Sequence, residues 1–360
     1  MTVGDKTAVV LFQLGGPDSL EAVEPFLTNL FNDPDIINFP GAFLARRPLA
    51  KYIAAKRYRK VADHYREIGG KSPIFELTGR QAAALEQELN RHISSTVYVA
   101  MRYWRPFTEE VIVKVKEGHF TKIILLPLYP QFSRATTMSS LKEWRRLCKA
   151  FDIPLAQSEP ICCYHSHPLY IEALADQITA TLKRFTAVQP RDIDLVFSAH
   201  GIPVGLIAEG DPYQLQIEAT VRSVLNHGAW RSPHSLCYQS KVGPAEWLKP
   251  SLGATIRDLA AKGRRHLLII PVAFVTEHIE TLHEINIEAR EEAHGFGVQQ
   301  FEMMPALNDH PKFIECLADL VLKKAKARPT GLAACRALHS AYPASRPPVL
   351  CPHWSAASLP

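Results

Sequence analysis

The segment HPLYIEALADQI at residues 167–178 recurs later in the chain as HPKFIECLADLV at residues 310–321. Seven of the twelve positions are identical: His, Pro, Ile, Glu, Leu, Ala and Asp. Both copies space their apolar residues as one face of a helix does. Because such a match within one chain is typical of an internal duplication, we predict two related halves.

Short apolar runs that end in loops occur around both copies. They are TAVVLFQLGGP (7–17), TVYVAMRYWRP (96–106), KIILLPLYPQF (122–132), IDLVFSAHGIP (193–203), HSLCYQSKVGP (234–244) and HLLIIPVAFVTEH (266–278). Helical patterns lie between the runs, which predicts βαβ units and parallel sheets. The expected fold class is therefore α/β, with two related Rossmann-like parallel-sheet halves and a ligand cleft between them.

We expect an N-terminal half at 5–185, a C-terminal half at 186–328 and a flexible tail at 329–360. The first half carries an insert near 32–75, which we interpret as an element at the mouth of the site. It holds the apolar residues Ile36, Ile37, Phe39, Phe43 and Leu44, followed by the basic residues Arg46, Arg47, Lys51, Lys56, Arg57, Arg59, Lys60 and Arg66. The basic stretch suits carboxylates, phosphates or an anionic membrane surface, and a solvated helix face fits equally well.

The composition is that of a globular protein. Of 360 residues, 47% are hydrophobic and 21% are charged with both signs mixed, so a core can form. A net charge of +5 without a basic, aromatic-lined stripe does not favour nucleic-acid binding. The longest apolar run, 267–275, is too short to span a bilayer, and the first residues lack a signal-peptide pattern. Seven cysteines without a CxxC pair predict a reduced, cytoplasmic protein.

A histidine closes one of the apolar runs. His200 follows LVFSA and precedes a glycine. Ligands in open α/β sheets bind beyond the carboxyl ends of the strands, which favours a functional position. The imidazole could be a metal ligand or a proton acceptor, and a satisfied core or surface histidine is the alternative.

The segment 276–293 predicts a helix with an acidic face. Its members are Glu277, Glu280, Glu284, Glu288 and Glu291. Like charges four residues apart each cost roughly 0.2–0.5 kcal/mol, which a solvated face can absorb. However, the row begins at a strand end and has His278 beside Glu280. Carboxylates with imidazole suit Fe²⁺, and a row of carboxylates could also carry protons.

Flat side chains lie near the predicted strand ends. They are Tyr103, Trp104, Tyr129, Phe132 and Trp247. They could line a pocket for a planar ligand, and ordinary core packing is the alternative. Arg102 offers a guanidinium for a carboxylate.

Together these strings resemble the ferrochelatase family. The matching motifs are LGGP (14–17), YREIGGKSPI (65–74), MRYWRPFTEE (101–110), YPQFSRATTMSS (129–140), SAHGIP (198–203), GDPY (210–213), QSKVGPAEWLKP (239–250) and HIETLHEINIE (278–288). The resemblance implies two Rossmann-like domains around a porphyrin cleft. It implies a lyase that inserts Fe²⁺ into protoporphyrin IX to form protohaem in haem biosynthesis.

The resemblance also implies roles for particular residues. His200 and Glu280 would handle the metal and the protons, and Glu284, Glu288 and His278 would form the path for protons or metal. The porphyrin contacts would be Leu14, Arg57, Tyr65, Ser72, Arg102, Tyr103 and Trp247. Arg59 competes with Arg57 for its place.

The resemblance sets the expected partners. These are protoporphyrin IX and ferrous iron as substrates, with no nucleic acid. FQLGGP at the first strand end resembles the protoporphyrin branch more than the coproporphyrin branch. The insert is either a lip that touches the inner membrane peripherally or a lid that packs on the protein.

No cofactor beyond substrate Fe²⁺ is expected. Some family members hold a [2Fe–2S] cluster in a C-terminal extension, but the tail here has only Cys335 and Cys351, whereas a cluster needs four thiolates. A cobalt-inserting tetrapyrrole chelatase and a non-catalytic tetrapyrrole carrier are the alternatives. The long insert and QSKVGPAEW argue against the first, and the retained His200 and glutamates argue against the second.

Overall fold

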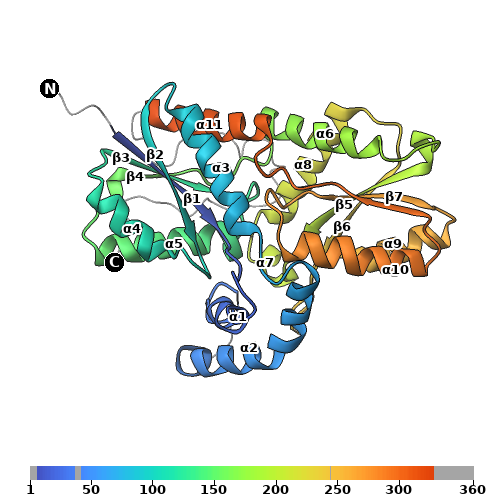
Figure 1. Ribbon diagram of the computed structural model, residues 1–360, viewed down its shortest axis with the longest axis horizontal. Helices are drawn as coiled ribbons and strands as arrows, with labels where there is room; N and C mark the ends of the chain where they lie inside the picture. The colour runs from blue at the N-terminus through green and yellow to red at the C-terminus, as the bar shows by residue number, and fades with distance from the viewer. Residues whose placement is uncertain (1–5, 37–41, 244, 328–360) are drawn as a thin grey trace.

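The computed structural model describes residues 6–36, 42–243 and 245–327. Its strands form two four-stranded parallel sheets (Figure 1). The first sheet has the order β2-β1-β3-β4 and contains β1 (Lys6–Gln13), β2 (Ser94–Met101), β3 (Lys122–Pro127) and β4 (Ser158–Pro160). The second has the order β6-β5-β7-β8 and contains β5 (Ile193–His200), β6 (His234–Gln239), β7 (His266–Pro271) and β8 (Gln300–Met303). The identical order confirms two related α/β halves.

The two central strands correspond residue by residue. β1 pairs with β2 from Lys6 to Gln13, and β5 pairs with β6 as far as His200, opposite Gln239. Both central strands are buried, because helices cover both faces of each parallel sheet. The last pairs with the third strands, Phe12 with Pro127 and Ser198 with Pro271, make Leu14 and not Gln13 the counterpart of His200.

The helices fill the connections between strands. In the first half they are α1 (Val23–Phe31), α2 (Ala42–Glu67), α3 (Ile74–Leu89), α4 (Thr108–Glu117), α5 (Ser139–Ala150) and α6 (Pro168–Leu182). In the second they are α7 (Val204–Ala208), α8 (Tyr213–Gly228), α9 (Leu252–Ala261), α10 (Arg290–Gly295) and α11 (Pro311–Lys326). Short 3₁₀ turns are η2 (Leu155–Gln157) and η3 (Pro190–Asp192), and two π-helical segments are η1 (Arg134–Met138) and η4 (Glu280–Ala289).

The repeated segments are α6 and α11, which begin at a proline as the first helical turn allows. The two helices pack against each other, and each crosses to the sheet of the other half. α11 lies against α3 and β3, whereas α6 lies against α8 and β7 (Figure 1). Because each of these helices packs on elements of the other half, the pair joins the two halves.

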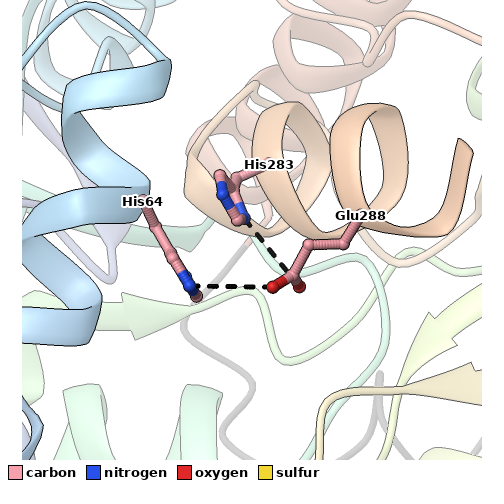
Figure 2. Close-up of side chains that lie close together, drawn as sticks. All are labelled: His64, His283 and Glu288. Carbon is pink, nitrogen blue, oxygen red and sulfur yellow. Dashed lines mark ion pairs between the residues drawn. The ribbon is translucent and has the colours of Figure 1, made fainter. Parts of the chain in front are cut away.

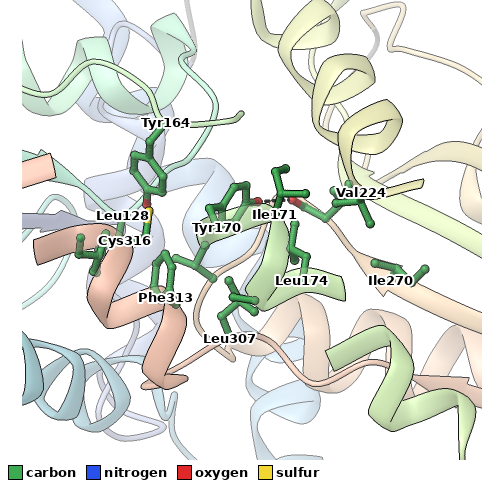
Figure 3. Packing of buried hydrophobic residues seen from close by; sticks show 14 of the residues in the cluster. Leu128, Tyr164, Tyr170, Ile171, Leu174, Val224, Ile270, Leu307, Phe313 and Cys316 are labelled. Atoms are coloured by element: carbon green, nitrogen blue, oxygen red, sulfur yellow. Dashed lines mark hydrogen bonds between the residues drawn. The ribbon is translucent and has the colours of Figure 1, made fainter. Parts of the chain in front are cut away.

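A single hydrophobic core runs through that junction. It includes Leu128 of the first half, Ile270 of the second, and Tyr170 and Phe313 of the repeated helices (Figure 3). The Tyr170 hydroxyl donates a hydrogen bond to the Val272 carbonyl at 3.0 Å, so the buried phenol is satisfied. The two halves are therefore held by shared packing.

The six predicted strands are all present, but two more were missed. β4 and β8 are short edge strands with the sequences SEP and QFEM, which carry no apolar run. Each strand also ends earlier than the predicted apolar run, and the last residues of the run form a loop. These loops at the carboxyl ends of the strands carry the side chains of the candidate site.

The insert forms α2, which lies together with the preceding helix α1 beyond one end of the sheets (Figure 1). Ile37, Phe39 and the side chains of Phe43 and Leu44 lie outside the described residues, as does the tail at 329–360 with Cys335 and Cys351. Among the described helices, none combines the length and apolar character that crossing a bilayer requires.

Candidate active site

The site is built on the end of β5. His200 is its last residue, and the Gly201 amide donates a hydrogen bond to the Gln239 carbonyl at 2.7 Å. A Cβ at Gly201 would lie 3.1 Å from that carbonyl and 3.2 Å from Trp247. The glycine is therefore needed for the close approach of the β5 and β6 ends that holds His200 in place.

His200 is paired with Glu280, the first residue of η4. His200 Nδ1 lies 2.9 Å from Glu280 Oε2. Burial alone would lower the pKa of His200, but the charge and hydrogen bond of Glu280 outweigh it and raise that pKa. Burial likewise opposes ionisation of Glu280, but His200 and then His278 hold its pKa well below the usual range. Glu280 thus makes His200 a stronger base and stabilises the imidazolium that forms when His200 takes up a proton.

A second imidazole faces the same carboxylate. His278 Nδ1 lies 3.0 Å from the Thr276 carbonyl oxygen, which can only accept, so Nδ1 carries the proton. Its Nε2 lies 3.5 Å from Glu280 Oε2. In neutral His278 this nitrogen bears a lone pair, so His278 and Glu280 suit a shared proton or cation between them.

Glu284 is held one turn further along η4. Its carboxylate accepts hydrogen bonds from the Ser240 amide at 2.8 Å and the Ser240 hydroxyl at 2.5 Å. Ser240 adopts a left-handed backbone with φ of +61°, which is strained for a non-glycine residue. Burial and then the charge of Glu280 raise the pKa of Glu284. Two carboxylates with pKa values moved in opposite directions suit a proton relay.

The acidic row is shorter than the sequence predicted, because the π-helix η4 begins at Glu280 and the residues from Thr276 to His278 are not helical. Glu277 is buried away from the row, where it accepts hydrogen bonds from the Ala306 amide at 2.8 Å and from the Thr281 hydroxyl. Glu291 is exposed on α10. The expectation was wrong for Glu277, since a helical wheel cannot locate a helix start or a π-helix, and π-helices often mark functional sites.

Aromatic and aliphatic side chains surround the histidine. The rings of Trp247 and Phe274 approach His200 edge-on, with centroids 6.2 and 6.3 Å away. Leu14, Trp104, Val242 and Ile279 are half-buried against an apolar cluster whose buried members include Tyr65 and Tyr103. This cluster brings α1 and α2 against residues of both halves. Phe132, by contrast, is buried at 2% exposure and fits the core-packing alternative.

Arg102 is already paired within the protein. Its guanidinium lies 2.8 Å from Asp33 Oδ2, and its Nε donates to the Ser139 hydroxyl at 2.8 Å. The Tyr103 hydroxyl donates to the same Asp33 oxygen at 2.8 Å. Sequence reasoning missed Asp33, because nothing in its neighbourhood resembles a site motif.

The remaining residues that were predicted to contact a porphyrin differ in their exposure to solvent. Ser72 is buried, and its amide donates to the Pro17 carbonyl at 2.8 Å, which ties the start of α3 to the loop after β1. Arg57 and Arg59 are both exposed on α2, and the Arg57 guanidinium lies over the Phe31 ring at 5.7 Å. Glu288, at the outer end of the acidic row, lies near His64 and His283. Neither of these histidines was predicted from the sequence.

Known proteins match this chain over most of its length. A family model described as Ferrochelatase matches residues 6–325. A protein named ferrochelatase from Citrifermentans bemidjiense is 46% identical, covering 90% of this chain and 100% of its own length. Another from Geobacter metallireducens is 47% identical, covering 89% and 99%, and one from Trichodesmium erythraeum is 44% identical, covering 88% and 82%.

A solved structure shares the fold at low identity. It is described as SirB from Bacillus subtilis with Fe3+, and it superposes with a TM-score of 0.52 at 12% identity, covering 89% of this chain and 96% of that one. This likeness supports the two-half α/β architecture alone.

Proposed function

This chain belongs to the ferrochelatase family, whose activity is the insertion of ferrous iron into a porphyrin during haem synthesis, and from this premise we propose that His200 and Glu280 carry out that reaction. The enzyme is a porphyrin metal chelatase of the lyase class. The observation that carries the proposal is the 2.9 Å contact between His200 Nδ1 and Glu280 Oε2 at the strand end.

The proton balance of the reaction gives each residue a task. Free porphyrin carries two pyrrole N–H groups, so binding one Fe²⁺ releases two protons. His200, whose pKa the Glu280 carboxylate raises, accepts a pyrrole proton as a general base. Glu280 remains ionised and attracts Fe²⁺, and His278 Nε2 faces the same oxygen. Glu284, whose pKa is raised, takes up protons next, and the exposed Glu288 passes them to solvent.

The porphyrin is proposed to lie against the apolar cluster beside His200. A planar macrocycle keeps its nitrogen lone pairs in the ring plane, where a metal cannot reach all four. Contacts with Leu14 and Trp247 on the ring would supply binding free energy to bend it, and a bent ring directs lone pairs toward the metal. After metallation the ring prefers to be flat, which favours release.

The other porphyrin contacts are proposed with different tasks. Exposed Arg57, or its neighbour Arg59, pairs with a propionate. Arg102 can do so only in competition with Asp33. Tyr65, Ser72 and Tyr103 are buried, and we assign them to shaping the wall on which the ring rests. The residues proposed to contact the porphyrin are Leu14, Arg57, Tyr65, Ser72, Arg102, Tyr103 and Trp247.

One assay tests the proposed function against its alternatives. Purified protein is mixed anaerobically with protoporphyrin IX and Fe²⁺, Co²⁺ or no metal, and the absorbance spectrum is followed. We expect catalytic turnover with Fe²⁺. Faster turnover with Co²⁺ than with Fe²⁺ would favour a cobalt chelatase, and stoichiometric porphyrin binding without turnover would favour a carrier.

We propose protoporphyrin IX, not coproporphyrin, as the porphyrin. Leu14 offers an apolar contact that cannot form a hydrogen bond, and it suits a ring with vinyl groups and two propionates. Four propionates would each need a cationic partner once desolvated. The test is competition of both porphyrins at equal concentration for limiting Fe²⁺, and a higher kcat/KM for coproporphyrin would overturn the choice.

We also propose peripheral contact with an anionic membrane from a cytoplasmic location. The exposed face of α2 carries Lys51, Lys56 and Lys60 together with Tyr52, which is 63% exposed. Basic side chains next to an amphipathic ring suit a membrane surface. Vesicles rich in phosphatidylserine should co-sediment the protein at low salt but not at high salt, and no binding at low salt would remove this proposal.

Two further proposals concern the organisation of the chain. We place the boundary between the halves at 185/186, ahead of β5, with the tail at 329–360 outside both. We propose that the enzyme uses no cofactor beyond substrate Fe²⁺. Iron and sulfide analysis of anaerobically purified protein should find no [2Fe–2S] cluster, and a stoichiometric cluster would contradict this proposal.

A further inference from the structure

Two histidines and a glutamate meet at the far end of η4 from His200. His64 comes from α2, and His283 and Glu288 come from η4 (Figure 2). One possible ligand atom from each residue lies within 4.8 Å of the other two. We propose that His64, His283 and Glu288 form a second metal site, which binds divalent first-row transition ions.

The hydrogen bond of His283 fixes which of its nitrogens is free. His283 Nε2 lies 3.0 Å from Glu67 Oε2. Since a carboxylate only accepts, Nε2 carries the ring proton, and Nδ1 is left with its lone pair 3.8 Å from Glu288 Oε2. Metal-binding histidines in proteins are commonly oriented by a carboxylate that accepts a hydrogen bond from the ring nitrogen that does not bind the metal. The His283 side chain is only 4% exposed, so packing holds this orientation.

His64 presents its ring on the same side. The His64 and His283 rings are stacked with centroids 3.9 Å apart and planes inclined by 13°. His64 Nε2 lies 3.6 Å from Glu288 Oε1, too far for a hydrogen bond.

These separations are close to those of a metal site. Ligands bonded at about 2.1 Å in a tetrahedron lie roughly 3.4 Å from one another. The distances of 3.6 and 3.8 Å reach the two different oxygens of Glu288, and the stacked rings are nearly parallel. Binding of one ion by both imidazoles therefore requires rotation of the more exposed His64 ring in addition to small shifts. Two imidazoles with one carboxylate select Fe²⁺, Co²⁺ or Zn²⁺ over Mg²⁺ or Ca²⁺, which prefer oxygen ligands throughout.

The exposure of the ligands suggests what the site does. The Glu288 side chain is 46% exposed and His64 is 22% exposed, so an ion can enter from solvent. Three protein ligands leave a coordination position open, unlike a closed structural site. Resting on the proposed function, we infer that Fe²⁺ from solvent is captured here, at a position separate from the one beside Glu280.

The binding test uses full-length protein in which His200→Ala and Glu280→Gln disable the inner position. Cobalt(II), titrated anaerobically in excess Mg²⁺, should bind at one equivalent and give visible ligand-field bands. Adding His64→Ala should weaken binding at least tenfold, and Glu67→Ala should weaken it by about 10- to 100-fold through the loss of the oriented ring. Glu288→Gln, at a more exposed position, should also weaken it.

His92→Ala is the matched control. His92 Nε2 lies 3.7 Å from Glu88 Oε1, a similar separation, but within the described ranges this pair has no third ligand. This change should leave cobalt affinity unaltered. No cobalt binding by the double variant, or the same affinity after His64→Ala and Glu288→Gln in protein with an unchanged circular dichroism spectrum, would overturn the proposal.

A kinetic readout separates this site from the main one. In otherwise unmodified protein, His64→Ala should raise the KM for Fe²⁺ severalfold and leave the KM for porphyrin unchanged. If unmodified protein fails to insert iron while the double variant still binds cobalt, the proposed function falls and the second metal site stands. Normal iron insertion with no cobalt binding by the double variant removes only the second site.

Discussion

The two sheets offer the same framework twice and use it differently. β1 ends at Gln13 and β5 ends at His200, and a π-helix follows the third strand of each half, η1 after β3 and η4 after β7. In the first half the strand end is neutral and fully used: the Gln13 side chain accepts from the Leu14 amide at 2.9 Å and donates to Thr276. η1, with the sequence RATTM, contains no acidic residue.

The second half has charged groups at its strand end, where His200 occupies the place that Leu14 has in the first half. His200 and Glu280 remain partly exposed, at 32% and 25%. A neutral amide can be buried once its hydrogen bonds are made, whereas an ionised pair is stabilised by its partner and by residual access to solvent. The comparison indicates that the fold supplies two related strand ends, of which the end of β5 carries the His200–Glu280 pair and the end of β1 a neutral, hydrogen-bonded amide.

The largest effect is expected where that charge is removed. Glu280→Gln keeps the size of the side chain but deprives His200 of its anionic partner, so iron insertion should fall on the order of 100-fold. Anaerobic initial rates measure the loss. A rate within twofold of the unmodified protein would indicate that the acidic face of η4 is merely solvated.

A smaller effect is expected one turn along η4. Glu284→Gln can still accept from the Ser240 amide, and it removes only a relay group, so the rate should fall by roughly tenfold or less. The same rate assay applies. A loss as large as that of Glu280→Gln would mean that the two carboxylates act as one unit.

The pH dependence of stability sharpens the comparison. The raised pKa of His200 gives stability that is present below its ordinary value of 6.5 and is lost as pH rises through the folded value. The lowered pKa of Glu280 gives stability that is present above 4.5 and is lost as pH falls. The difference in unfolding free energy between unmodified protein and Glu280→Gln should therefore be greatest between these two values. Urea denaturation across pH would contradict this if the difference grew toward pH 9.

The smallest effect concerns the repeated helices. His167 Nε2 lies 2.8 Å from Asp319 Oδ2, whereas its repeat counterpart, His310 Nε2, lies 4.0 Å from Asp176 Oδ2. Each aspartate also pairs with a lysine, Asp319 with Lys323 at 2.6 Å and Asp176 with Lys312 at 2.8 Å, so the histidines are the residues to change. His167→Gln should lower the free energy of unfolding by about 0.5–1 kcal/mol, and His310→Gln by less. Chemical denaturation measures both. Equal losses would mean that the two contacts are equivalent despite their different lengths.

Much of the fold could be predicted from the sequence, because apolar runs and a repeated helix are local patterns. The six long strands and α6 and α11 follow from such patterns. β4 and β8 do not, since edge strands of three and four residues need no apolar run. The start of η4 was also missed, because the hydrogen bonds that draw Glu277 away depend on Ala306, far along the chain.

The site could be predicted only in part, for the same reason. His200 and Glu280 lie in short recognisable strings, and the structure brings them within hydrogen-bonding distance. Asp33 pairs with Arg102, and His64 stacks on His283, across separations that no local pattern records. Contacts of that kind depend on how α1 and α2 fold back onto both halves.

The most direct test compares the two strand ends in one experiment. Initial rates of Fe²⁺ insertion into protoporphyrin IX are measured anaerobically for His200→Ala and for Gln13→Ala, with circular dichroism to verify that both are folded. The predicted result is a loss of roughly 100- to 10,000-fold for His200→Ala, the range that general-base catalysis supplies, and a loss below tenfold for Gln13→Ala. Near-normal turnover by His200→Ala, or equal losses in the two variants, would contradict the assignment of the chemistry to the second half.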